Sequence, residues 1–147
     1  MKAIRILIFS ALLLTLLSGC GDASFTTDRN PLIAIASRGE NDGGGLNVMT
    51  NRLQDLCIEA GFRTHYEMCG NVGQIQNAQL KNMVANHPAA LAVLFASDAA
   101  AIDAGRKAVQ AAGIPVILID PIRAEEDPKG EADRVFQEIL RHVEPVR

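Results

Sequence analysis

The sequence predicts an α/β domain in which a four-stranded parallel sheet, with strand order 2-1-3-4, is flanked by helices in a flavodoxin-like arrangement. Short apolar segments alternate with longer segments of helical spacing, which is typical of βα repeats with right-handed crossovers. Residues 91–95 and 116–119 are continuous apolar runs, as expected for parallel strands covered on both faces. Residues 62–68 instead alternate between apolar and polar, which favours a strand at the sheet edge.

The first βα unit begins with the apolar run at residues 32–36. A turn-rich segment, residues 37–45, follows it and predicts a loop. Apolar residues then recur at helical spacing, which predicts a helix over about residues 46–60. Gly61 stands where a helix commonly ends.

The second unit is the edge strand followed by a helix predicted over about residues 72–86. Asn71 and Gln74 have the spacing of a capping box at the start of this helix, and Pro88 ends it. The side chains expected to face the core are Val72, Ile75, Leu80, Met83 and Val84.

The third and fourth units begin with the two continuous apolar runs, which we expect to lie centrally or nearly so. Between them, Ser97 or Asp98 is predicted to cap a helix that ends at Gly113. After Asp120-Pro121 we expect a charged loop to about Gly130 and then a last amphipathic helix. Its apolar positions are Val135, Phe136, Ile139, Leu140 and Val143.

The N-terminal segment combines a basic start, an apolar run and a cysteine. Lys2 and Arg5 precede an apolar run from Ile6 to Leu17, which is shorter than the roughly 20 residues needed to span a bilayer. Leu17-Ser-Gly-Cys20 resembles a lipobox, and the whole segment is similar to the signal sequence of bacterial lipoproteins. That resemblance implies cleavage after Gly19 and attachment of fatty acyl chains to Cys20, which together form a stable membrane anchor.

Removal of residues 1–19 would leave a tether over residues 20–30 and a single domain over residues 31–147, the usual size for one domain. The mature chain would carry 12 basic and 17 acidic side chains, a formal net charge of −5. Nucleic acid is therefore not an expected partner, since phosphate contacts need a basic surface. We expect the chain on the periplasmic side of the envelope. Because Gly21 replaces an aspartate that retains many lipoproteins at the inner membrane, the outer membrane is slightly favoured.

Ligands of open α/β sheets bind beyond the carboxyl ends of the strands, where the strand order reverses. Here that point falls between the first and third strands, so the loops at 37–45 and 96–98 form the candidate site, with Asp120 nearby. The three glycines at 43–45 lack the remaining residues of a phosphate-binding loop. His65, His87 and His142 lack metal-ligand spacing, and no residue stands out as a nucleophile. We expect no enzymatic activity, no catalytic residue, no metal and no cofactor.

Cys57 and Cys69 would lie in an oxidising compartment, where a disulfide is one alternative. In the predicted fold they belong to opposite ends of the βαβ unit, separated by a strand of about 20 Å. A disulfide needs Cα atoms within about 7 Å. We therefore favour two free thiols.

Three phrases between residues 32 and 120 have a recognisable pattern. The most specific is Ala111-Ala-Gly-Ile-Pro-Val-Ile-Leu-Ile-Asp120; Gly61-Phe62 and Gln74-Ile75-Gln76 add to it. With these phrases, residues 32–120 resemble the first lobe of periplasmic sugar-binding proteins of the ribose-binding, LacI-like type. The resemblance implies that Ser37, Asn41 and Asp120 contact the ligand. An aspartate can accept hydrogen bonds from sugar hydroxyls.

The chain also departs from that family. Gly43 and Gly44 stand where aromatic residues usually stack on the sugar, Phe95 and Pro121 replace polar or basic residues, and the second lobe is missing. Two hypotheses follow. In the first, the protein is a single lobe for a small polar ligand, serving transport as a homodimer or with a transporter. In the second, it is a non-catalytic protein-interaction lipoprotein, or a truncated relic that no longer binds ligand.

Overall fold

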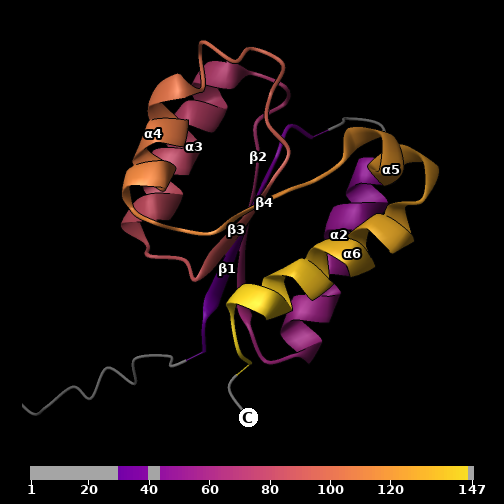
Figure 1. The fold of residues 1–147 in the computed structure, drawn as a ribbon. Helices are drawn as coiled ribbons and strands as arrows, with labels where there is room; N and C mark the ends of the chain where they lie inside the picture. The colour runs from indigo at the N-terminus through magenta and orange to yellow at the C-terminus, as the bar shows by residue number, and fades with distance from the viewer. Residues whose placement is uncertain (1–29, 40–43, 146–147) are drawn as a thin grey trace, which may run out of the picture.

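The computed structural model describes residues 30–39 and 44–145. The predicted signal peptide, Cys20, most of the tether and Asn41 lie outside these residues. Within them the chain forms the predicted α/β fold (Figure 1).

The sheet has four parallel strands in the order β2-β1-β3-β4, as predicted. They are β1 (Leu32–Ser37), β2 (Arg63–Met68), β3 (Ala90–Val93) and β4 (Val116–Leu118). Strand β1 is central, with Ile33 and Ile35 packed on one face and Ala34 and Ala36 on the other, and all of its residues from Ile33 to Ser37 are buried. The alternating strand β2 is an edge strand, as its pattern indicates.

Helices cover the two faces of the sheet unequally (Figure 1). One face carries α2 (Gly45–Glu59), α5 (Pro121–Glu126) and α6 (Pro128–His142). The other carries α3 (Gly73–Ala85) and α4 (Asp103–Ala111). Each face has its own apolar cluster: Ile33, Ile35, Met49, Leu53, Ile117, Val135 and Ile139 belong to the first, and Ala34, Ala36, Leu80, Met83, Leu91, Val93 and Val109 to the second.

The two glycines predicted to end helices, Gly61 and Gly113, adopt the left-handed backbone conformation that glycine tolerates best. Gly61 has φ 85° just after α2, and Gly113 has φ 65° just after α4. Each turn returns the chain to the amino end of the next strand.

The start of α3 differs from the prediction. The N-cap is Val72, which makes no side-chain capping bond, so the predicted capping box of Asn71 and Gln74 does not form. Asn71 instead has φ 60°, and its Oδ1 accepts a hydrogen bond from the Ser97 N–H. This register exposes Val72 and Ile75, which were predicted to be buried, and turns Gln76 into the interior.

Two further helix starts also differ from the prediction. Helix α4 begins at Asp103 rather than at a cap by Ser97 or Asp98; the Asp98 carboxylate accepts a hydrogen bond from Ala101 N–H in the preceding turn. The segment predicted as a loop up to Gly130 holds the short helix α5 and the first turn of α6. Asp120 and Asp127 cap these two helices, each followed by proline at the first position, where proline is tolerated.

Strand β4 is not covered on both faces, as its apolar sequence had suggested. Ile117 and Ile119 are buried under α6, but Val116 and Leu118 on the opposite face are 40% and 58% exposed. The cause is the path of the chain, since after β4 it turns back to the face of α2 and leaves β4 bare on the side of α4 (Figure 1).

Cys57 and Cys69 are both buried and unpaired, as predicted. Burial raises the pKa of the Cys57 thiol to about 12, so this group remains a neutral part of the core at physiological pH.

Candidate functional site

The predicted ligand site lies at the carboxyl ends of β1 and β3, where the strand order reverses. Ser37 ends β1 and is fully buried, and its Oγ accepts a hydrogen bond from the Gly39 N–H at 3.0 Å. The hydroxyl thus stabilises the turn that leaves the strand. Ser37 therefore presents no exposed surface to a ligand in this structure.

Asp120 lies beyond the end of β4 and caps α5. Its Oδ1 accepts hydrogen bonds from Ile122 N–H at 2.9 Å and Arg123 N–H at 3.2 Å. Such a cap satisfies two of the amide donors that a helix start leaves without partners. The carboxylate predicted to contact a sugar therefore has a structural role here.

Helix α5 packs against the amino end of α2, next to the glycine loop. Glu125 Oε2 accepts a hydrogen bond from the Gly45 N–H at 3.2 Å. A Cβ added at Gly45 would lie 2.3 Å from the Ala124 carbonyl oxygen, so the two helices meet where only glycine fits. A carboxylate of the chain itself thus takes the position at this helix start that an anionic ligand would use.

Glu131 on α6 forms the centre of a buried ionic cluster behind Asp120. Its side chain is fully buried, and Oε1 accepts hydrogen bonds from the Asp120 N–H at 2.8 Å and from Arg134 at 2.6 Å. Arg123 approaches Oε2 at 3.5 Å. This hydrogen bonding raises the pKa of Arg134, so the guanidinium stays charged.

Gln76 fixes the other side of the predicted site. Its side chain is fully buried; Nε2 donates to the Leu94 carbonyl at 3.0 Å, and Oε1 accepts from the Ala96 N–H at 2.5 Å. The amide therefore pairs both backbone groups of the turn that leaves β3. Like Ser37 and Asp120, it holds a loop in place through hydrogen bonds within the chain.

Sequence reasoning identified Ser37 and Asp120 but gave Gln76 and Glu131 no role. Gln76 appeared only within the family-like phrase, and Glu131 falls at the start of the predicted last helix without being one of its apolar positions. Neither has a motif of its own. Their burial follows from the registers of α3 and α6, which a helical pattern locates only to within a turn.

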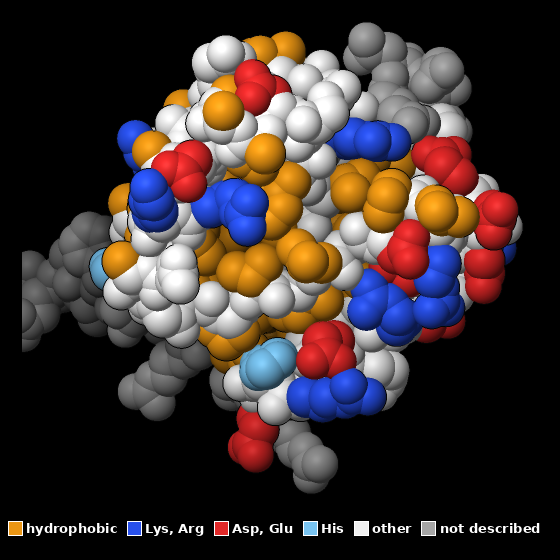
Figure 2. Space-filling model, turned by 45° about the horizontal axis from the view of Figure 1, so that its top comes forward, with side chains coloured by type: hydrophobic (Ala, Val, Ile, Leu, Met, Phe, Trp, Pro, Cys, Tyr) orange, Lys and Arg blue, Asp and Glu red, His pale blue; other side chains and the backbone are white. Residues whose placement is uncertain are grey.

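A concave surface lies elsewhere, between α4 and α6 over the bare face of β4 (Figure 2). We call it the β4 groove. Its volume is about 680 Å³. The lining residues are Leu91, Phe95, Arg106, Val109, Gln110, Gly113, Ile114, Pro115, Val116, Leu118 and His142. Figure 2 shows hydrophobic side chains gathered in the hollow, with Lys and Arg side chains on both sides of it.

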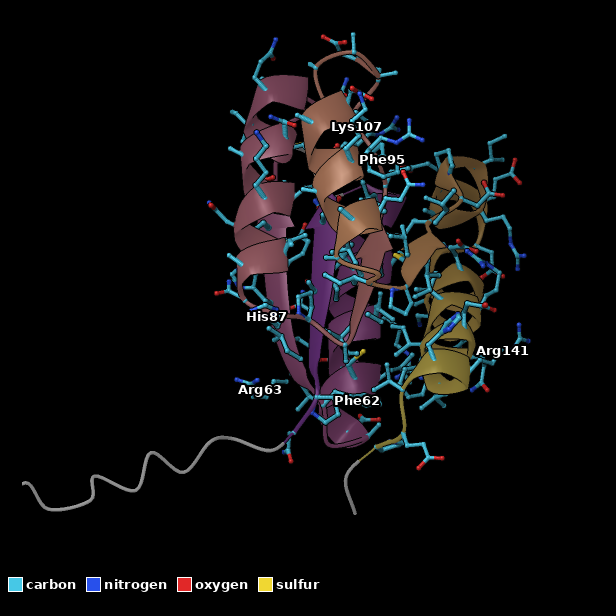
Figure 3. All side chains as sticks on the ribbon, turned by 60° about the vertical axis from the view of Figure 1, so that its left-hand side comes forward. Phe62, Arg63, His87, Phe95, Lys107 and Arg141 are labelled. Carbon is cyan, nitrogen blue, oxygen red and sulfur yellow. The ribbon has the colours of Figure 1, made fainter. Side chains whose placement is uncertain are left out.

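The basic residues that line the β4 groove are Arg106 and His142. The Arg106 guanidinium lies over the Phe95 ring at 5.3 Å from its centroid, a cation–π contact on the α4 side. His142 lies on the α6 side, with Nε2 3.5 Å from a Glu138 carboxylate oxygen. Figure 3 shows Phe95 and Lys107 near the upper end of α4, with Arg141 across the groove on α6.

The outer edge of β4, opposite β3, has no neighbouring strand among the described residues. Pairing with β3 uses the odd-numbered residues: Leu91 N–H donates to Pro115 O, and Ile119 N–H donates to Val93 O. Val116 and Leu118 therefore turn their N–H and C=O groups to the open edge. One of these groups is occupied, since Arg134 donates to the Leu118 carbonyl at 2.7 Å.

Within residues 30–39 and 44–145, no group of three or more His, Cys, Asp or Glu side chains could hold a metal ion. His65 pairs with Glu67 at 2.7 Å, far along the chain from His142. In the same ranges no helix is long and apolar enough to cross a membrane.

No model of a known protein family matches the chain, and no curated protein matches it. The functional argument therefore depends on the geometry above.

Proposed function

We propose that the protein is a lipid-anchored, non-catalytic binding module of the bacterial cell envelope, and that it holds a partner protein in the β4 groove. The observation that carries this proposal is the bare apolar face of β4, with Val116 and Leu118 exposed beside Phe95 and Ile114. Soluble domains rarely leave contiguous apolar surface uncovered, and such a patch commonly marks an interaction site.

The alternative of a sugar-binding lobe has less support. Ser37 is buried, and Ser37 and Asp120 both accept hydrogen bonds from backbone N–H groups two residues further along the chain. A sugar would have to compete with these bonds, and each is worth about 1 kcal/mol or more.

The test places a photo-reactive amino acid in the full chain, expressed in the native bacterium, at position 118 or at position 58. Leu118 and Ile58 are matched in exposure, at 58% and 59%, but Ile58 lies on α2, on the other face of the sheet. We expect a discrete cross-linked protein adduct from position 118 and none from position 58.

Three outcomes would contradict the proposal. No adduct from position 118 would mean that the β4 groove has no protein partner in the cell. Equal adducts from both positions would indicate nonspecific contact. In a thermal-shift screen of the purified chain, a sugar could raise the melting temperature, and Ser37→Ala could abolish that shift. This result would show that the ligand site lies in the loops at the carboxyl ends of the strands.

A further inference from the structure

We propose that the β4 groove takes an amphipathic helix with acidic flanks, supplied by another protein, rather than an added β-strand or a second copy of this chain. The inference rests on the proposed function, because it names the chemistry of the partner. It follows from which parts of β4 are open, what the chain itself can offer, and which charges line the groove.

The first step is that the face of β4 is open, whereas Arg134 occupies one of the outward backbone groups at its edge. Arg134 donates a hydrogen bond to the outward-facing Leu118 carbonyl. It also donates one to Glu131, which is fully buried. A strand added at this edge would have to displace the guanidinium and leave Glu131 with Arg123, at 3.5 Å, as its remaining cation. Breaking a buried ion pair is costly, and charged groups at sheet edges oppose strand addition.

The second step is that the open face of β4 forms a groove of a shape that can hold a helix. Val109 and Gln110 of α4 form one wall, and Leu91, Val116 and Leu118 of β3 and β4 form the floor. Helices on one face of a sheet pack side by side at about 10 Å. A helix laid beside α4 would therefore cover Leu91, Val116 and Leu118, and it would not touch the edge of β4 that Arg134 occupies.

The third step concerns what a second copy could insert. On the described helices, the exposed large hydrophobic side chains are Val48 and Ile58 on α2, ten positions apart, Val72 and Ile75 at the start of α3, and Ile122 alone on the six-residue α5. Neither pair extends along one helix face for several turns, as groove-binding helices require. The described helices of a second copy thus offer no matching stripe.

The fourth step is the charge of the lining. Arg106 and His142 are its ionisable residues, and no Asp or Glu is among the lining side chains, although the whole chain has a formal net charge of −3. The nearest carboxylate to His142 is Glu138, which is already paired with Arg141. Opposite charge at the rim favours and orients association, so acidic residues should flank the apolar stripe of the partner.

The test measures binding of three labelled synthetic peptides to the purified full chain in detergent by fluorescence anisotropy. The first is a helix with a Leu/Ala stripe and Glu flanks, the second has the same stripe with Lys flanks, and the third is an alternating Val/Thr strand peptide. We expect the Glu-flanked helix to bind about tenfold more tightly than the Lys-flanked one, and the strand peptide not to bind.

Variants of exposed residues locate the site without disturbing the core. Leu118→Asp should weaken the Glu-flanked helix by at least about tenfold, whereas Ile58→Asp, of equal exposure, should leave its affinity unchanged. Arg106→Glu should remove or reverse the preference between the two helices. Circular dichroism confirms that each variant is folded.

Several results would overturn this inference. These are equal binding of the two helices, preference for the strand peptide, absence of binding by all three, or a cross-linked adduct with the mass of two copies of this chain. Such results would leave the proposed function standing if position 118 still cross-links to a protein in cells. Loss of that adduct would instead remove the proposed function itself.

Discussion

At the scale of single residues, Asp120 separates the two hypotheses for the carboxyl end of the sheet. Its Oδ1 accepts hydrogen bonds from Ile122 and Arg123 N–H groups, so the structure gives it a capping role. Asparagine caps helices about as well as aspartate, whereas alanine does not.

We therefore predict that Asp120→Ala lowers the free energy of unfolding by about 1 kcal/mol, and that Asp120→Asn changes it by less than about 0.5 kcal/mol. Urea denaturation of the two variants and the parent protein measures both values. Equal stability of Asp120→Ala and the parent would show that the cap contributes nothing.

Cys57 gives a prediction that depends on pH. Its pKa rises from 9.0 to about 12 on folding, because burial disfavours the thiolate. The unfolded chain releases this proton first, so the stability that the buried neutral thiol provides is complete below pH 9. It falls as the pH rises from about 9 to about 12, by ~1.4 kcal/mol for each pH unit as an upper bound.

Cys57→Ala should therefore lose less stability than the parent over that alkaline range, although it starts lower because a cavity forms in the core. Chemical denaturation at a series of pH values measures the difference, and taking that difference cancels the titration of groups common to both proteins. Parallel pH profiles for the two proteins would contradict the assigned burial.

Residue roles were the hardest feature to predict from sequence. Ser37 and Asp120 were correctly placed near the ends of β1 and β4, but the sequence could not show that their oxygens would be satisfied by nearby N–H groups. Gln76 and Glu131 became buried through helix register alone. Polar residues of these types are usually exposed, so composition gave no reason to select them.

At the scale of elements, the position of α5 determines how accessible the carboxyl end of the sheet is. It is a six-residue helix whose Ala124 is buried and whose backbone lies against Gly45. A helix this short is not stable alone, so its packing against α2 and α6 must hold it.

We predict that Gly45→Ala displaces α5, since the new Cβ would lie 2.3 Å from the Ala124 carbonyl oxygen. The cost should be about 1–3 kcal/mol, as for overpacking elsewhere. Hydrogen exchange should show faster exchange of the Ala124 and Asp127 amides, which bond within α5, while exchange in the central strand β1 stays slow.

The matched control is Glu125→Gln, which keeps an oxygen acceptor for the Gly45 N–H and adds no atom at the helix contact. Its exchange rates should equal those of the parent. If Gly45→Ala leaves the α5 amides equally protected, the contact between α2 and α5 is looser than its geometry indicates.

Element prediction succeeded where one pattern dominated. The parallel strands, their order and the edge position of β2 followed from apolar runs and alternation. The same logic failed for β4, because an apolar run predicts two covered faces and cannot show that the next helix returns to the other side. Helix α5 was missed because a charged, proline-containing segment also fits a loop, and its cap needs the structure to be recognised.

At the scale of the whole molecule, the fold separates the expected anchor from the loops at the carboxyl ends. The described chain begins at Asn30, whose carbonyl accepts a hydrogen bond from Arg63 at the start of β2, so it enters at the amino end of the sheet (Figure 3). A lipidated Cys20 would be joined to this end by about ten residues, which span at most ~35 Å. The β4 groove lies between α4 and α6, over β3 and β4.

The last prediction tests the anchor on which this arrangement depends. Cys20→Ser should abolish labelling of the protein by a clickable fatty-acid analogue in cells, because the thioether and the subsequent acylation both require the thiol. The protein should then leave the membrane fraction or accumulate with residues 1–19 still attached. Cys69→Ser is the matched control: Cys69 is buried and unpaired in the folded domain, so its replacement should leave labelling unchanged. Labelling that survives in Cys20→Ser would contradict the lipoprotein hypothesis. An unlabelled but correctly exported Cys20→Ser protein that still cross-links through position 118 would show that the β4 groove binds its partner without the anchor.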